Sequence, residues 1–255
     1  MKSILLYIVY HDDESEVKAK QTAQRIMHAE PSVEPYTIRV SNESPYFESQ
    51  VFAKMNLEFH DSFKWIGVVT HNFDSKNAHN PINIEKQVGH GEANGADVIS
   101  LLNIDFEKPR VGRSVSFVES AAMQHGPFLW MVIHYLFKMQ GYKEEDFTNK
   151  DIQGFFSNWW LAKPAVMAKY VKFVKQCQHI VSVNPLVSRY IKEDGYYLGH
   201  AHKKSINDER LQKIFGCTHY TLHPFVFERL PPIFCHVIGC KLYRAGSVVN
   251  WHLGD

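Results

Sequence analysis

The first apolar segment of the chain constrains its fold most strongly. Residues 3–11 read Ser-Ile-Leu-Leu-Tyr-Ile-Val-Tyr-His, an almost unbroken run of aliphatic and aromatic side chains. Such a run predicts a strand that is buried on both faces, which is typical of parallel sheets in α/β domains. The acidic run 12–14 follows at once and leads into a helical pattern that extends to Ala29. We expect Ser15 to be the N-cap of that helix.

The first 105 residues repeat this alternation of strand and helix. Further strands are expected at 36–40, 65–70 and 96–105, and further helices begin near Tyr46 and Ile84. This order predicts an α/β fold in which helices flank a mostly parallel sheet. The chain contains neither G-x-G-x-x-G nor G-x-x-x-x-G-K-[ST]. A dinucleotide-binding Rossmann site and a P-loop are therefore disfavoured.

The second part of the chain is richer in helical patterns. A polar link at 107–114 precedes it, and the tail 240–255 shows no clear period. Strands are expected at 155–161 and 220–223, with Pro224 as the first residue of the helix that follows. Expected helices cover 126–139, 164–178, 186–193 and 211–215. A chain of 255 residues suits a single large α/β domain.

Composition excludes several classes of protein. The 28 basic and 27 acidic residues nearly balance, which argues against a nucleic-acid partner held by a broad basic surface. No apolar run reaches the roughly 18 residues of a transmembrane helix, and the N-terminus lacks a signal-peptide cleavage pattern. The four cysteines show no CxxC spacing. We therefore expect reduced thiols and a cytoplasmic location.

The end of the first strand is the first candidate for a ligand site. In open α/β sheets, ligands bind beyond the carboxyl ends of the strands. Tyr10, His11 and Asp12 are expected at that edge. The alternative is that they only end a strand and cap a helix.

Three segments resemble GT-A nucleotide-sugar glycosyltransferases, including capsular-polysaccharide-type enzymes and the glycosyltransferase domains of large algal viruses. The segments are 96–105, 155–170 and 223–230, and 46–48 and 65–76 have looser counterparts. The resemblance implies a GT-A-like, Rossmann-related fold with a mixed, mostly parallel central sheet flanked by helices. Within the single domain 1–255, it implies a nucleotide-binding half, 1–105, and an acceptor-binding half, 106–255.

The end of segment 96–105 resembles the acid-x-acid turn by which that family holds a divalent ion against the donor diphosphate. Here the turn reads Asn103-Ile104-Asp105, with Asn103 in place of the first acid. The resemblance implies a Mn²⁺ or Mg²⁺ ion on Asp105, with His223 as a further ligand. An amide oxygen is a weaker ligand than a carboxylate, so weak binding is expected without the donor. His200 and His202 are a second candidate pair, for which solvated loop histidines are the alternative.

The resemblance also implies a set of donor contacts. Lys76 and Arg229 would neutralise the leaving phosphates, and Asn158 would bind sugar hydroxyls. The expected donor-binding residues are Tyr10, His11, Asp12, Thr70, Lys76, Asn103, Asn158 and Arg229.

Glu228 is the expected catalytic base, since an inverting enzyme needs a carboxylate that takes the proton of the acceptor hydroxyl. The alternative to this catalytic role is that Glu228 only forms an ion pair with Arg229. Trp159 and Trp160 are the expected acceptor-binding residues, because an indole offers a flat apolar face to a sugar ring. The alternative is that these Trp side chains pack in the core, and we expect one of the two to do so.

Together these features predict a glycosyltransferase, a hexosyl- or pentosyltransferase. It would move a sugar from a UDP- or GDP-linked donor to a glycan acceptor in surface polysaccharide or glycoprotein glycan synthesis. The alternative function is a catalytically inactive nucleotide- or carbohydrate-binding protein of the same fold. The missing first acid at Asn103 favours that alternative.

Overall fold

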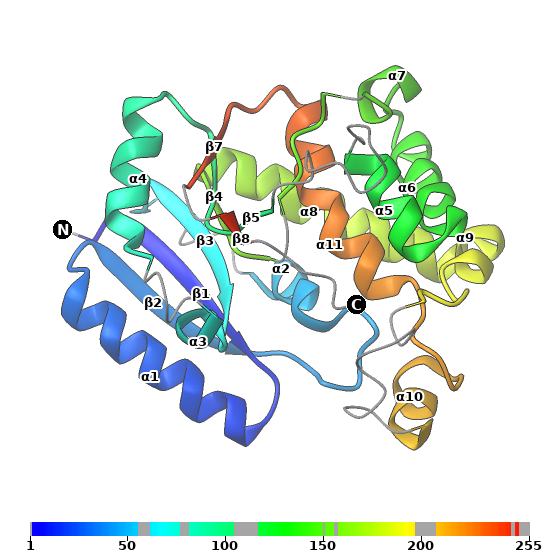
Figure 1. Cartoon of the computed structure of the whole chain (residues 1–255), viewed down its shortest axis with the longest axis horizontal. Helices are drawn as coiled ribbons and strands as arrows, with labels where there is room; N and C mark the ends of the chain where they lie inside the picture. The colour runs from blue at the N-terminus through cyan, green and yellow to red at the C-terminus, as the bar shows by residue number, and fades with distance from the viewer. Residues whose placement is uncertain are drawn as a thin grey trace.

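A mixed six-stranded sheet forms the centre of the molecule (Figure 1). The computed structural model describes residues 2–55, 62–76, 82–104, 117–149, 151–155, 158–196, 208–245 and 248–249. The strand order is β2-β1-β3-β6-β4-β7. The strands are β1 (Ile4–Tyr10), β2 (Val33–Arg39), β3 (Trp65–Thr70), β4 (Val98–Ser100), β6 (Trp160–Ala162) and β7 (Leu242–Arg244). All neighbours are parallel except β6, which runs antiparallel to both β3 and β4.

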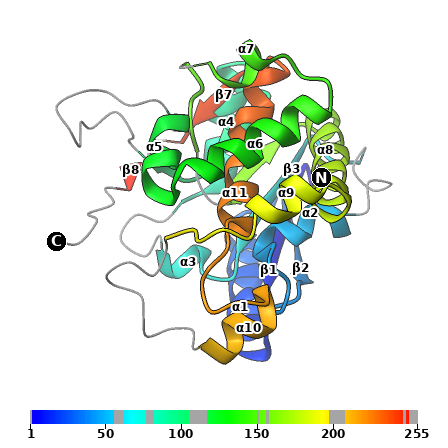
Figure 2. The ribbon, with the colours of Figure 1, turned by 90° about the vertical axis from the view of Figure 1, so that its right-hand side faces the viewer.

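Helices cover both faces of this sheet, as the two views of the ribbon show (Figures 1 and 2). On one face lie α1 (Asp13–Ala29), α3 (Phe73–Lys76) and α4 (Ile84–Ala93). The other face carries the larger set, which begins with the 3₁₀ turn η1 (Phe47–Ser49). The helices of this set are α2 (Gln50–Lys54), α5 (Phe117–His125), α6 (Pro127–Met139), α7 (Glu144–Phe147), α8 (Pro164–Val183), α9 (Pro185–Tyr190), α10 (Asp208–Phe215) and α11 (His223–Val237).

Strand β1 confirms the prediction of a strand buried on both faces. Ile4, Leu6 and Ile8 pack into the core beneath α1 and α4, and Leu5 and Tyr7 pack into the core on the opposite face. Successive side chains of a strand point to opposite faces, so only a run that is apolar at every position satisfies both cores. The predicted α/β class with a mostly parallel sheet flanked by helices is therefore confirmed.

The start of α1 differs from its prediction. Asp12, not Ser15, is the N-cap, and the two residues form a capping box. Asp12 Oδ1 accepts a hydrogen bond from the Ser15 backbone N–H at 2.8 Å, and Ser15 Oγ accepts one from the Asp12 backbone N–H at 2.9 Å. Ser15 thus stands at the third helical position, where its hydroxyl replaces the usual Glu or Gln of such a box.

Several elements from residue 96 onward were predicted with wrong bounds or not at all. The expected strand 155–161 is the three-residue β6, and the expected strand 220–223 is a single bridge between Asp194 and Thr221. Helix α5 and strand β7 had no prediction. The expected strand 96–105 divides into β4 and the short β5 (Asn103–Ile104), which pairs in parallel with β8 (Val248–Val249). None of the described helices combines the length and apolar character needed to cross a membrane.

A buried carboxylate joins three helices on the α1 face. Glu30, only 1% exposed, accepts hydrogen bonds at its Oε2 from the backbone N–H groups of Ile84 (2.6 Å) and Glu85 (3.0 Å), at the start of α4. Arg25 lies 3.5 Å from its other oxygen and also pairs with Asp74 of α3 at 2.7 Å. Burial raises the pKa of Glu30, against the lowering effect of those backbone donors and of Arg25.

We predict that Glu30→Ala lowers the free energy of unfolding by about 2 kcal/mol, because one buried and one half-buried N–H group lose their acceptor. Urea unfolding at neutral pH measures the effect. The control is Glu34→Ala on β2, whose surface pair with Lys2 at 3.7 Å should be worth well under about 1 kcal/mol. Equal losses for the two variants would contradict the role of Glu30.

Candidate functional site

The carboxyl ends of β1 and β3 and the beginning of β6 meet at one edge of the sheet. Because β6 is antiparallel, its first residues lie beside the last residues of β3 and β4. The Trp159 indole N–H donates to Thr70 Oγ1 at 3.1 Å, and the His71 backbone N–H donates to the Val9 carbonyl at 2.9 Å. We call this region the carboxyl edge, and define it by residues 10–12, 70–71, 103 and 158. Of the predicted donor contacts, all except Lys76 and Arg229 fall within it.

Two histidines lie together on the carboxyl edge. The rings of His11 and His71 meet edge to face with centroids 5.0 Å apart, and His11 Nε2 lies 3.3 Å from Asp12 Oδ2. Burial, and secondarily His11, lowers the pKa of His71, so its ring is neutral at pH 7. The backbone and side-chain hydrogen bonds from Ser15 lower the pKa of Asp12 and keep it a carboxylate. The edge thus offers one anion and one neutral imidazole side by side.

Two buried polar atoms on this edge have no hydrogen-bond partner among the described residues. They are His71 Nδ1 and Asn158 Oδ1. Asn158 is only 3% exposed, and its amide nitrogen donates to Ser49 Oγ at 3.3 Å. An unsatisfied buried polar atom costs free energy, and such atoms gather where a ligand supplies the missing partner. His71 was not among the predicted site residues, although it follows β3 directly just as His11 follows β1.

His223, the predicted further metal ligand, is the first residue of α11. Its ring packs edge to face on Tyr46 at 5.6 Å between centroids, and its Nδ1 lies 2.9 Å from Thr221 Oγ1. Burial, with a smaller contribution from Lys192, lowers the pKa of His223 to about 4. The ring is therefore neutral and already hydrogen-bonded through Nδ1.

The predicted metal centre receives no complete ligand set from the described part of the chain. Within it, no group of three or more His, Cys, Asp or Glu side chains could hold an ion. Asp105, His200 and His202 lie outside the described residues, and the structure describes only the backbone of Asn103. A metal site at this edge stays a prediction.

Arg229 and Glu228 are adjacent on α11 but differ in exposure. Arg229 is 2% exposed, and its guanidinium donates to the Phe225 carbonyl at 3.1 Å and to Gln124 Oε1 at 3.2 Å. It also lies 3.0 Å from His125 Nε2 and 3.5 Å from Glu228 Oε2. Burial lowers the pKa of Arg229 to about 10. The guanidinium thus has protein partners, whereas the Glu228 side chain is 33% exposed.

The two predicted acceptor-stacking residues are both core residues. Trp159 and Trp160 are fully buried. Trp159 packs on Phe73, and Trp160 packs on Phe52 and Tyr170. As they are packed, neither indole offers a face to an acceptor. This corrects the expectation that one of them does.

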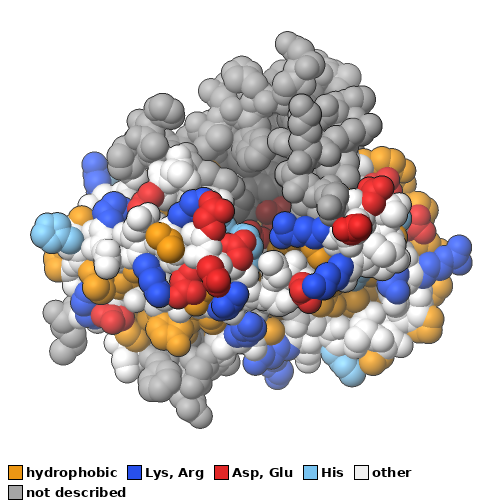
Figure 3. Space-filling model, turned by 90° about the horizontal axis from the view of Figure 1, so that it is seen from below, with side chains coloured by type: hydrophobic (Ala, Val, Ile, Leu, Met, Phe, Trp, Pro, Cys, Tyr) orange, Lys and Arg blue, Asp and Glu red, His pale blue; other side chains and the backbone are white. Residues whose placement is uncertain are grey.

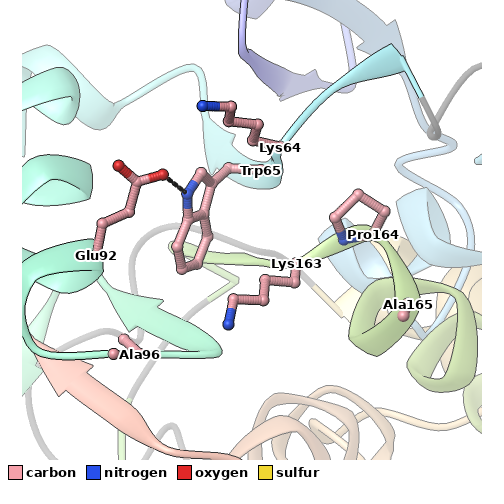
Figure 4. Close-up of a pocket in the computed structure, with 8 residues that line it drawn as sticks. Lys64, Trp65, Glu92, Ala96, Lys163, Pro164 and Ala165 are labelled. Carbon is pink, nitrogen blue, oxygen red and sulfur yellow. Dashed lines mark hydrogen bonds between the residues drawn. The ribbon is translucent and has the colours of Figure 1, made fainter.

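A separate pocket of about 520 Å³ lies at the opposite edge of the sheet, where β3 begins and β6 ends (Figure 4). Lys64, Trp65, Glu92 and Lys163 line it, and the Trp65 indole N–H donates to Glu92 at 3.0 Å. Lys163 is paired with Asp97 at 2.8 Å. None of the predicted site residues lines this pocket. The carboxyl edge is the stronger candidate because ligands of α/β sheets bind there.

Seen from below the orientation of Figure 1, acidic and basic side chains crowd the middle of the face (Figure 3). Lys76, the last residue of α3, is described by its backbone alone.

Comparison of the chain with the profiles of known protein families, with curated proteins and with solved structures finds no significant match. The interpretation of the site therefore rests on its geometry and on the sequence resemblance.

We predict that the protein loses stability as the pH falls from about 6.5 to 5. Burial lowers the pKa of His125 to about 3 and that of His223 to about 4, from 6.5. Below about pH 6.5, these two rings bind protons in the unfolded chain but not in the folded protein. Each ring therefore lowers the free energy of unfolding by about 2 kcal/mol at pH 5.

Urea unfolding of the wild type at pH 7 and pH 5 measures this loss. His125→Gln and His223→Gln should each reduce the difference between the two pH values, whereas His28→Gln on the exposed side of α1 should not. An unchanged pH dependence in both buried-histidine variants would contradict the assignment.

Proposed function

We propose that the protein is a GT-A-like glycosyltransferase that binds a UDP- or GDP-linked sugar at the carboxyl edge and transfers the sugar to a glycan. One observation carries the proposal: His71 Nδ1 and Asn158 Oδ1 are buried without partners at the edge where α/β sheets bind ligands. The mixed sheet, parallel except for β6, agrees with the architecture that the resemblance implies.

The chemistry of the edge suits a hydroxyl-rich ligand. Asn158 Oδ1 is an acceptor, and neutral His71 can donate or accept at Nδ1 according to its tautomer. A ribose or a hexose presents hydroxyl groups that satisfy both. An uncharged imidazole and a buried amide orient such a ligand without the cost of desolvating a second charge.

Transfer breaks the bond between the anomeric carbon of the sugar and a diphosphate oxygen, and forms a bond from that carbon to an acceptor oxygen. The acceptor proton passes to a base, and we assign that role to Glu228, because its carboxylate is partly exposed. Arg229 Nη1 lies 3.5 Å from Glu228 Oε2, so the proposed base forms an ion pair with a neighbouring cation. The diphosphate leaves with its electron pair, and Lys76 is the proposed cation that stabilises it.

A binding protein of the same fold, without transferase activity, is the second candidate. Asn103 replaces the first acid of the metal-holding turn, and the Arg229 guanidinium is occupied by Gln124 and the Phe225 carbonyl. Both features weaken the stabilisation of a leaving diphosphate. They leave the recognition of hydroxyl groups at Asn158 intact.

Isothermal titration with UDP, GDP and their sugar conjugates, with and without Mn²⁺, tests binding. We predict that Asn158→Ala weakens binding of the preferred donor about tenfold, the effect of one lost hydrogen bond to a buried acceptor. Asn94→Ala, on the exposed end of α4 at the opposite edge, is the matched control and should bind normally. No binding of any donor by the wild type would end the proposal.

A transfer assay on the donor that binds, with a panel of glycan acceptors, separates the two candidates. Glu228→Gln should bind the donor normally and lose transfer at least about a hundredfold, since removal of a general base typically costs that much. Glu145→Gln on exposed α7 is the control. Undiminished transfer by Glu228→Gln would remove Glu228 as the base. Donor binding by the wild type without any transfer would favour the binding protein.

A further inference from the structure

Helix α11 ends in a Schellman motif that places two cysteines at its paired positions. Gly239 has φ +72°, its N–H donates to the His236 carbonyl at 2.9 Å, and the Cys240 N–H donates to the Cys235 carbonyl at 2.8 Å. In this motif, the hydrogen bond that spans five residue steps joins two residues whose side chains lie against each other. Those residues are Cys240 and Cys235.

Two other helices of the chain end in the same motif and show how close the paired side chains come. After α6, the Tyr142 N–H donates to the Phe137 carbonyl, and the rings of these residues are 5.5 Å apart. After α4, the Ala96 N–H donates to the Gly91 carbonyl, and a β-carbon built on Gly91 lies 3.7 Å from the Ala96 β-carbon. Disulfides require β-carbons about 3.5–4.5 Å apart. The motif therefore supplies the separation that a disulfide needs.

The two thiols differ in their surroundings. Cys235 is buried in the core, whereas Cys240 is half-buried at the surface. Their mutual contact lowers the pKa of the Cys240 thiol and, together with burial, raises the pKa of the Cys235 thiol. Lys169 and Lys163 add to the lowering at Cys240, against burial and Asp97. Cys240 is thus the thiol that ionises and meets solvent.

We propose that Cys235 and Cys240 form an oxidation site, at which a hydroperoxide converts the two thiols into an intrachain disulfide. This inference is independent of the proposed glycosyltransferase function. It rests on the helix-end geometry and on the pairing of one exposed with one buried thiol.

The chemistry takes place in two steps. The Cys240 thiolate attacks one peroxide oxygen, breaks the O–O bond and becomes a sulfenic acid. The other oxygen takes up a proton and leaves as water from hydrogen peroxide, or as an alcohol from an organic hydroperoxide. The Cys235 thiol then attacks the Cys240 sulfur, forms the S–S bond and displaces the hydroxyl group, which takes the thiol proton and leaves as water. One peroxide is reduced, and two thiols lose one electron each.

The bond would fasten the end of α11 to the start of β7. Lys241 follows Cys240 directly. Its N–H donates to Asp97 Oδ2 at 3.1 Å, and its carbonyl accepts from the Asp97 N–H at 2.8 Å. The oxidised pair therefore links the helix that carries Glu228 to the outer strand of the sheet.

Peptide mass spectrometry of the full chain tests the proposal. The protein is treated with hydrogen peroxide, its remaining thiols are alkylated during unfolding, and it is digested with trypsin. Both cysteines fall on one peptide, 230–241, between Arg229 and Lys241. After peroxide treatment, we expect this peptide to be unalkylated and about 2 Da lighter than its dithiol form. It should become doubly alkylated only when the protein is reduced before alkylation. Cys177, which is buried in the core, should stay a thiol.

Variants distinguish the motif from general thiol reactivity. Gly239→Ala strains the left-handed residue of the motif and should slow disulfide formation about fivefold. The control is Gly141→Ala, which places the same substitution at φ +84° in the motif after α6. It should not change the rate of disulfide formation. In Cys235→Ser, dimedone should trap Cys240 as a sulfenic acid. Peptide 230–241 recovered doubly alkylated after peroxide treatment, or a disulfide between separate chains, would overturn the proposal.

Discussion

The antiparallel insertion of β6 between β3 and β4 is the constraint on which the arrangement of the candidate site depends. A parallel strand in that place would begin at the amino edge, beside Trp65 and Val98. Strand β6 runs the other way, and its first residue, Trp160, lies between Val68 of β3 and Ser100 of β4. The segment that precedes β6 therefore lies at the carboxyl edge. Asn158 thereby directly precedes the residue that bonds Thr70, and its amide donates to Ser49. The hydrogen bond from Trp159 to Thr70 fixes this junction.

Several buried polar groups of the described residues are uncharged. His71, His125 and His223 all have a pKa that burial lowers, and they are neutral in the folded protein. Asn158 adds a buried amide. Asp12 and Glu228 lie nearer the surface, whereas Arg229 is a buried cation that donates to Gln124 and to the Phe225 carbonyl. The two uncharged buried groups with a free polar atom, His71 and Asn158, suit a ligand that is rich in hydroxyl groups.

The elements predicted correctly are those whose sequence pattern is compatible with a single kind of structure. The run 4–10 is apolar at every position and has no other place than the middle of a sheet, and β3 was predicted at its observed bounds, 65–70. Strand β7 was missed because Leu242, Tyr243 and Arg244 are only half-buried at an outer position and show neither alternation nor a continuous apolar run. The start of α1 was misplaced because an Asp-to-Ser capping box offers two plausible caps three residues apart.

The site was harder to predict than the fold, because residue type does not reveal exposure. Trp159 and Trp160 have the chemistry of sugar-stacking residues, but three-residue β6 lies in the middle of the sheet and buries both. Arg229 follows the acidic Glu228, which is compatible with a surface ion pair, yet its position on α11 points it at Gln124 and His125. The signal for His71 was present in the sequence, since it follows a buried strand as His11 does.

Histidine side-chain NMR during titration with a nucleotide sugar tests the central claim most directly. The account predicts that the ring nitrogen signals of His11 and His71 shift together and saturate with the donor. His90 on α4, whose ring lies beside Tyr243 toward the opposite edge, should not move. Saturating shifts of His90 with His11 and His71 unchanged would contradict the account, because the ligand would then occupy the other edge of the sheet.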